Sequence, residues 1–167
     1  LEEALGRPLE DRESLVVRHR DRHTVQVAAE AVRAGVAGLL ARHPNLRACF
    51  RHEHVDRPVQ VIPRAVKPPW TEIDRTGRAP DETEAELGRL MAEDRDRRFD
   101  LARPPLVRAT LVRHDTGADL LLTLHHILLD GWSLPLLAKE LQALTAGPPA
   151  DAELPPVVPF KQYLIWL

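Results

Sequence analysis

LLLTLHHILLDGWS, residues 120–133, is an apolar stretch that contains two adjacent histidines and ends near an aspartate and a glycine. Seven of its fourteen residues are Leu or Ile. Neighbouring side chains of a strand point to opposite faces, so Leu120, Leu122 and Leu124 would share one face. Leu121 and Thr123 would lie on the other. Because both faces are largely apolar, the stretch predicts a strand that is buried on both sides.

The flanking sequence places this strand between a second strand and a helix. RPPLVRATLVRHD (103–115) and ADLLLTLHHIL (118–128) lie on either side of a turn-like DTGA, which predicts an antiparallel hairpin. Ser133 is expected to cap a helix over LPLLAKELQAL (134–144), with Pro135 tolerated in its first turn.

Two more helices are expected upstream. QVAAEAVRAGVAGLLARH (26–43) has apolar residues at helical spacing and should end before Pro44. Asp81 is expected to cap a helix that runs to about Arg98. Short strands are expected at residues 14–19, 46–55, 58–63 and 68–74. Helices and strands mix without strict β-α-β alternation, which indicates an α+β fold: a mixed, largely antiparallel sheet with helices packed on it.

Composition narrows the classes of function. The 167 residues suit one compact domain or one lobe of a larger one, and an apolar content of 44% can build a core. The formal net charge of −2 gives no reason to expect nucleic-acid binding, and no apolar run reaches the roughly 18 residues that span a membrane. Cys49 is the single cysteine, which excludes an internal disulfide and fits the reducing cytoplasm.

The two histidines are expected to do different work. In a strand His125 and His126 would point to opposite faces, so one would pack while the other faces a cavity. A desolvated imidazole favours the neutral form that a general base requires. Asp130, in the turn before the helix, would either orient an imidazole or pair with a distant cation, and Gly131 permits a tight or positive-φ bend. On spacing alone, a purely structural pair of histidines remains equally open.

Five segments carry a resemblance to a known family. HHILLDG resembles the His-His-x-x-x-Asp-Gly motif of condensation domains in nonribosomal peptide synthetases. ARHPNLRACF resembles that family's Arg-His-Glu-x-Leu-Arg-Thr-x-Phe segment, although Pro44 replaces Glu and Ala48 replaces Thr. RRFDLARPPLVRATLVR resembles its Phe-Asp-Leu…Pro-Leu-x-Arg segment, and PVQVI and FKQYLIWL are also similar to family stretches. The resemblance is clear from about Ala31 to the end of the chain.

The resemblance implies a fold and an activity. Residues 1–167 would form the N-terminal lobe of a chloramphenicol-acetyltransferase-like fold, whose C-terminal lobe is absent from this chain and whose active channel lies between the two lobes. The implied activity is that of an amide-bond-forming acyltransferase in antibiotic and other secondary-metabolite biosynthesis. Upstream and downstream peptidyl carrier proteins would present thioesters on phosphopantetheine arms, with no cofactor bound directly. An adenylation domain would adjoin, and the isolated lobe would be inactive.

The resemblance also assigns roles within the motif. His126 would lie near the attacking amine, and His125 would be mainly structural. Asp130 would point away from the substrate and pair with Arg47, with Arg42 as the next candidate cation. Gly131 would give room at the channel and bring its N–H toward the oxyanion. Along the substrate channel the resemblance places Trp132 and Ser133; the side chains of Trp132 and Trp166 are also expected to pack.

Other functions remain open at this stage. The chain could be a non-catalytic lobe that binds a carrier protein, a stand-alone acyltransferase with the same His-x-x-x-Asp core, or an epimerization domain. A cyclization domain is disfavoured, because that subtype has Asp in place of the motif's histidines. His52 and His54 have metal-like spacing but no third ligand, so no metal site is expected. Cys49 is expected in the core, and EDRDRRFD (93–100) on a solvated helix face rather than in a docking patch.

Overall fold

The computed structural model of the chain describes residues 12–19, 25–147 and 154–166, and its centre is a four-stranded mixed sheet. The strand order is β1 (Arg12–His19), β6 (Gly117–His125), β5 (Val107–His114) and β4 (Trp70–Asp74). β1 and β5 each run antiparallel to β6, while β4 runs parallel to β5. The expected α+β architecture with a largely antiparallel sheet is therefore confirmed.

The β5–β6 hairpin forms as predicted, with a shorter turn. His114 pairs with Gly117, so the turn itself holds two residues rather than the four of DTGA. All nine residues of β6 are buried, which confirms the strand predicted from its leucines. Leu120, Leu122 and Leu124 join the main core cluster, whereas Thr123 is buried on the other face.

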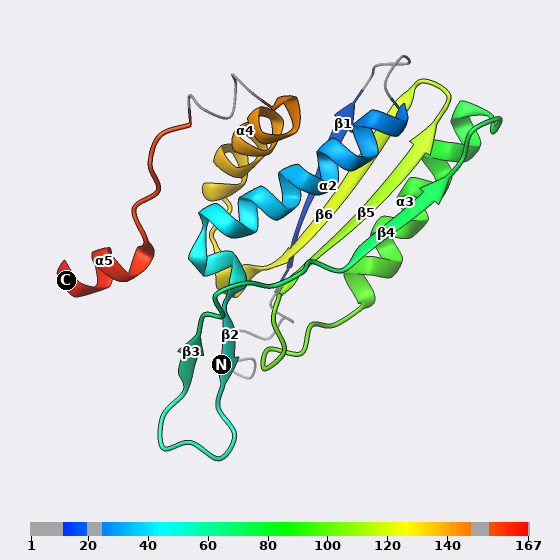
Figure 1. Cartoon of the computed structure of the whole chain (residues 1–167). Helices are drawn as coiled ribbons and strands as arrows, with labels where there is room; N and C mark the ends of the chain where they lie inside the picture. The colour runs from blue at the N-terminus through cyan, green and yellow to red at the C-terminus, as the bar shows by residue number, and fades with distance from the viewer. Residues whose placement is uncertain (1–11, 20–24, 148–153, 167) are drawn as a thin grey trace.

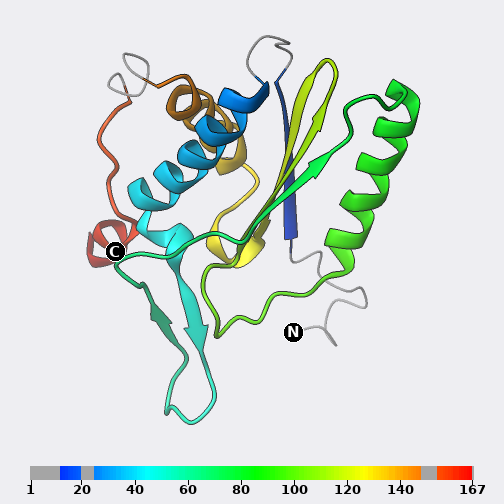
Figure 2. The same ribbon diagram turned by 45° about the vertical axis from the view of Figure 1, so that its right-hand side comes forward.

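Helices cover the sheet on both faces (Figures 1 and 2). α2 (Val25–Arg42) and α4 (Ser133–Ala146) lie on one face, and α3 (Pro80–Asp96) lies on the other. The main core lies under α2 and α4, where each fully buried leucine contributes about 1.5–3 kcal/mol. α2 and α4 approach closely at Gly35, where an added Cβ would stand 2.7 Å from Thr145 Oγ1.

Helix α3 begins two residues earlier than the sequence indicated. Pro80 is its first residue and Ala79 its N-cap, so the expected cap at Asp81 is wrong. The fixed φ of proline suits the first helical position, where its missing N–H costs no hydrogen bond. Asp81 and Glu82 instead lie in the first turn, where carboxylates interact favourably with the helix dipole.

The segment predicted as one strand over residues 46–55 is divided. A 3-10 helix, η2 (Pro44–Arg47), follows α2, and a short strand β2 (Cys49–Arg51) pairs with β3 (Val59–Val61) in a separate two-stranded sheet. This β2–β3 hairpin projects from one end of the main sheet (Figures 1 and 2). Cys49 is buried, as predicted. His52 and His54 lie beyond β2 and are exposed, so they share no strand face.

Residues 154–166 end in a short helix, α5 (Phe160–Trp166). Trp132 and Trp166 were expected to pack, but their side chains are 88% and 79% exposed within this chain. None of the helices within the described residues is long and apolar enough to cross a membrane. Nor do the described side chains include a group of three or more metal-type ligands that could hold a metal ion.

Candidate active site

His125 ends strand β6 and is held inside the protein. The main-chain ladder between β1 and β6 terminates at this residue, opposite Arg12. The imidazole Nδ1 accepts a hydrogen bond of 3.1 Å from the Ile127 N–H, so the proton of the neutral ring lies on Nε2. The ring also meets Phe99 edge-on, with centroids 6.0 Å apart. These contacts fix the residue that immediately precedes His126.

A buried ion pair lies behind Phe99. The Arg108 guanidinium stacks 3.8 Å from the Phe99 ring centroid and donates to Asp94 Oδ1 at 2.7 Å. It also donates to the carbonyls of Asp94 and Arg97 at the end of α3, each at 2.9 Å. Burial alone would raise the pKa of Asp94, but the hydrogen bonds from Arg108, together with the Thr123 hydroxyl, outweigh it and hold that pKa below its usual range. α3 is thus tied to β5, the strand that pairs with the strand ending at His125.

His126 does not continue the strand. It begins a 3-10 turn, η3 (His126–Leu128), and its side chain is exposed while that of His125 is buried. The prediction that both histidines stand in one strand is therefore wrong. β6 ends at His125, and the chain then turns through η3 toward α4. The different environments of the two rings, one packed and one open, are as the sequence indicated.

Asp130 caps helix α4 and has no arginine partner among the residues that the structure describes. Its Oδ1 accepts hydrogen bonds from the Ser133 hydroxyl at 2.8 Å and the Ser133 N–H at 3.0 Å. These bonds lower the pKa of Asp130 below its ordinary value. The predicted N-cap at Ser133 is wrong: Ser133 is the first residue of α4 and Trp132 holds the N-cap position, while Asp130 caps the helix through the Ser133 N–H. A carboxylate three residues ahead of a helical N–H reaches that donor locally, without a distant cation.

The predicted Arg47–Asp130 pair is not formed. Arg47 Nε–H donates to the Pro63 carbonyl at 3.0 Å, and its Nη1 donates to the carbonyls of Leu40 and Ala41. The last carbonyls of a helix lack partners within the helix and carry partial negative charge, so they attract a guanidinium. Arg42, the second candidate, is paired with Glu140.

Gly131 and Trp132 lie outside the cleft described next. Gly131 does not adopt a positive φ, and an added Cβ there would meet no atom within 4 Å. The bend after Asp130 therefore does not require glycine, although the space around it is open. Ser133, in contrast, lines the cleft.

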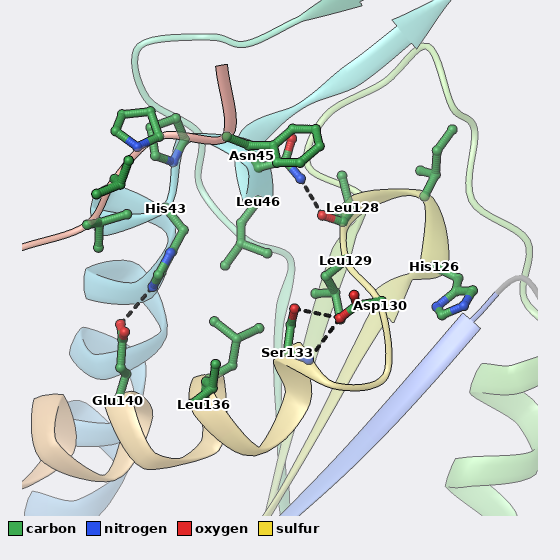
Figure 3. Close-up of a pocket in the computed structure, with 17 residues that line it drawn as sticks. His43, Asn45, Leu46, His126, Leu128, Leu129, Asp130, Ser133, Leu136 and Glu140 are labelled. Carbon is green, nitrogen blue, oxygen red and sulfur yellow. Dashed lines mark hydrogen bonds and ion pairs between the residues drawn. The ribbon is translucent and has the colours of Figure 1, made fainter. Parts of the chain in front are cut away.

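A cleft of about 700 Å³ lies where the end of α2, η2, η3, the start of α4 and residues 157–160 meet (Figure 3). Most of its lining is aliphatic. Its polar side chains are His43, Asn45, His126, Asp130, Ser133 and Glu140. In Figure 3, His43 and Glu140 lie on one side of the η3–α4 connection, and His126 lies on the other. The cleft thus combines a large apolar surface with a few polar groups, as small-molecule sites do.

Sequence reasoning missed three of these polar residues. His43 Nε2 lies 2.7 Å from Glu140 Oε2, and Arg42 Nε–H donates to the same oxygen at 3.1 Å. Burial would raise the pKa of Glu140, yet these partners hold it below its ordinary value. The third missed residue is Asn45, which contacts the Leu128 carbonyl. His43 and Asn45 lie within ARHPNLRACF, so that segment contained the available signal.

A family model described as Condensation domain matches residues 11–167 of the chain. The chain belongs to the condensation domain family. This condensation-domain chain is 38% identical over 144 residues to a linear gramicidin synthase protein of Brevibacillus parabrevis, covering 84% of the chain and 3% of that protein. It is 41% identical over 145 residues to phosphinothricin tripeptide synthetase PhsC of Streptomyces viridochromogenes, covering 84% of the chain and 13% of that protein.

Solved structures agree with this membership. The chain superimposes with a TM-score of 0.75 and 32% identity on a structure from work on condensation domain-mediated chain release from the enacyloxin polyketide synthase. That match covers 94% of this chain and 30% of the other. The epimerization domain from the third module of tyrocidine synthetase B shares the fold, with a TM-score of 0.76 and 20% identity, and 35% of it is covered. The condensation-domain chain therefore spans only a minor part of each of these solved chains and a smaller part still of the two synthetases.

Proposed function

We propose that residues 1–167 form the N-terminal lobe of a condensation domain that joins two carrier-bound thioesters through an amide bond. The observation that carries the proposal is the placement of His126. It is the second histidine of the family motif, it is exposed at the wall of the cleft, and both flanking segments are anchored. A second lobe would close the opposite wall of the channel.

In the proposed reaction the amine of the downstream aminoacyl thioester attacks the carbonyl carbon of the upstream thioester. A C–N bond forms, the C–S bond breaks, and the upstream phosphopantetheine thiol leaves. His126 takes the proton of the amine, or holds it by a hydrogen bond, and the leaving thiolate takes up a proton. Much of the rate comes from holding the two arms in one geometry. No covalent intermediate on the chain is required.

The other motif residues have supporting roles in this proposal. His125 and Asp130 fix the two ends of the segment that carries His126. The open space at Gly131 leaves room for an approaching arm, and its N–H would approach the developing oxyanion. Trp132 and Ser133 follow at the start of α4, where Ser133 lines the cleft and Trp132 lies outside it. Upstream and downstream peptidyl carrier proteins are the proposed partners, with an adenylation domain adjoining.

The test replaces His126 by alanine in the complete two-lobe protein, with loaded carrier proteins as substrates. Loss of a general base should lower kcat by about 10²–10⁴-fold. The thermal midpoint should stay near that of the unmodified protein, because the side chain is exposed. His52→Ala, which removes an exposed imidazole outside the cleft, is the matched control and should leave both quantities unchanged. Full turnover by His126→Ala would refute the proposal.

A further inference from the structure

Asn45 connects three segments that are far apart in the sequence. It lies in η2 and is partly buried at the wall of the cleft. Its Nδ2 donates to the main-chain carbonyl of Leu128 in η3, as Figure 3 shows. Its Oδ1 accepts a hydrogen bond of 2.7 Å from Gln60 Nε2 in β3. The one amide therefore links the β2–β3 hairpin to the turn that begins with His126.

One partner of this amide has a fixed polarity. A carbonyl can only accept, so the nitrogen of Asn45 has to face Leu128. Gln60 donates to the oxygen, which holds the amide in that orientation. A three-residue 3-10 turn leaves its last carbonyls without partners inside the turn. The Leu128 side chain is buried in the core, so its carbonyl has one fixed direction, and Asn45 satisfies it there.

We infer that Asn45 is a positioning residue that holds His126 in place through the Leu128 carbonyl. Leu128 lies between the two motif residues at the cleft, His126 and Asp130. The His125 ring secures the start of η3, and the Asp130 cap secures the connection to α4. Asn45 adds a tether from a different part of the chain. A general base works only within about 2.6–3.2 Å of the proton it takes, so a small shift of this turn matters.

The kinetic part of this inference rests on the proposed function, whereas the effect on the turn does not. Asn45→Asp keeps the size of the side chain and removes the donor to Leu128. The Asp carboxylate can still accept from Gln60 Nε2, and adding Gln60→Lys turns this link between η2 and β3 into an ion pair without restoring the donor to Leu128. The double variant thus separates holding the hairpin from holding the turn. Gln142→Ala removes an exposed amide on α4 and is the matched control.

Two measurements in the complete two-lobe protein test the inference. Hydrogen exchange at the Ile127 and Leu129 amides, which bond within the motif, should become at least about tenfold faster in Asn45→Asp. With loaded carrier proteins, kcat should fall about 10- to 100-fold while KM stays within about twofold, because misplacement affects chemistry more than binding. The double variant should recover the thermal midpoint but neither kcat nor slow exchange, and Gln142→Ala should match the unmodified protein throughout.

Different failures have different meanings. Unchanged exchange and unchanged kcat in Asn45→Asp would overturn the inference. Recovery of kcat by the double variant would also overturn it, since the amide would then only hold the hairpin. Faster exchange in a protein whose unmodified form shows no condensation would instead support Asn45 as the tether of the turn and refute the proposed function.

Discussion

Replacing Arg108 by alanine should be among the most damaging single changes to the stability of this chain. The Arg108 side chain is only 9% exposed and that of its partner Asp94 only 15%. Without the guanidinium, Asp94 remains as a buried carboxylate without its cation, which costs about 3–5 kcal/mol. The stacking on Phe99 and the two bonds to carbonyls at the end of α3 are lost as well. At about 2–4 °C per kcal/mol for a chain of this size, the midpoint should fall by roughly 6–20 °C.

Arg103→Ala provides a control of the same chemistry. Arg103 also pairs with an aspartate, Asp100 at 3.2 Å, but its side chain is 87% exposed. An exposed pair of this kind contributes about 0–1 kcal/mol, so the midpoint should barely move. Thermal and urea unfolding of the two variants and the unmodified protein decide the matter. Equal midpoints for Arg108→Ala and Arg103→Ala would refute the reasoning from burial.

Acid should reduce the difference between Arg108→Ala and the unmodified protein. The folded protein holds the pKa of Asp94 below its unfolded value, so the pair stabilises above the unfolded pKa, and this stability is lost as the pH falls through the folded pKa. In Arg108→Ala, burial is no longer outweighed by the guanidinium and raises the pKa of Asp94. Acid then neutralises the unpaired carboxylate and relieves the variant. A difference in unfolding free energy that stays constant from pH 7 to about pH 3 would contradict this account.

Two further outcomes are expected. Asp130→Ala should lower the thermal midpoint less than Arg108→Ala, because it removes only the hydrogen bonds that cap α4. Since the pKa of Asp130 is lowered in the folded protein, this loss of stability should disappear as the pH falls through the folded pKa. A loss as large as that of Arg108→Ala would instead indicate that Asp130 pairs with a buried cation. Residues 1–167 alone should self-associate, because Trp132, Leu136, Val158 and Ile165 are exposed. They should form no amide bonds with loaded carriers until a second lobe is added, covalently or separately, and the restored activity should depend on His126. Activity of the isolated lobe at the rate of the complete protein would refute the two-lobe proposal.

Elements set by local patterns were predictable from the sequence. The leucines of β6 indicated burial on both faces, and all of its residues are buried. Pro44 indicated the end of the preceding helix, and α2 ends at Arg42. The hairpin of β5 and β6 followed from two β-rich runs around a turn. Each of these depends on neighbours in the sequence, where periodicity and turn residues determine the result.

Partners of charged side chains were not predictable, because they depend on distances that the sequence does not contain. Asp130 could have paired with a remote arginine, but the Ser133 N–H and hydroxyl are three residues away and already oriented by the helix. Arg47 was equally able to reach a carboxylate, yet carbonyls at the end of α2 are closer. The contact between His43 and Glu140 joins residues 97 positions apart. No local pattern specifies such a contact.

Residues 120–133 combine a buried strand with two imidazoles because the buried strand and His125 hold His126 in position. They do not bury the His126 ring itself. The buried ring is His125, which is packed and hydrogen-bonded, while the ring proposed to meet the substrate is exposed. General-base chemistry gains from a site that excludes water, since electrostatic interactions are stronger there. The described part of this chain does not bury His126, so under the proposed function the second lobe has to exclude that water. Ile127 and Trp132, exposed apolar side chains on either side of Asp130, are suited to contact it.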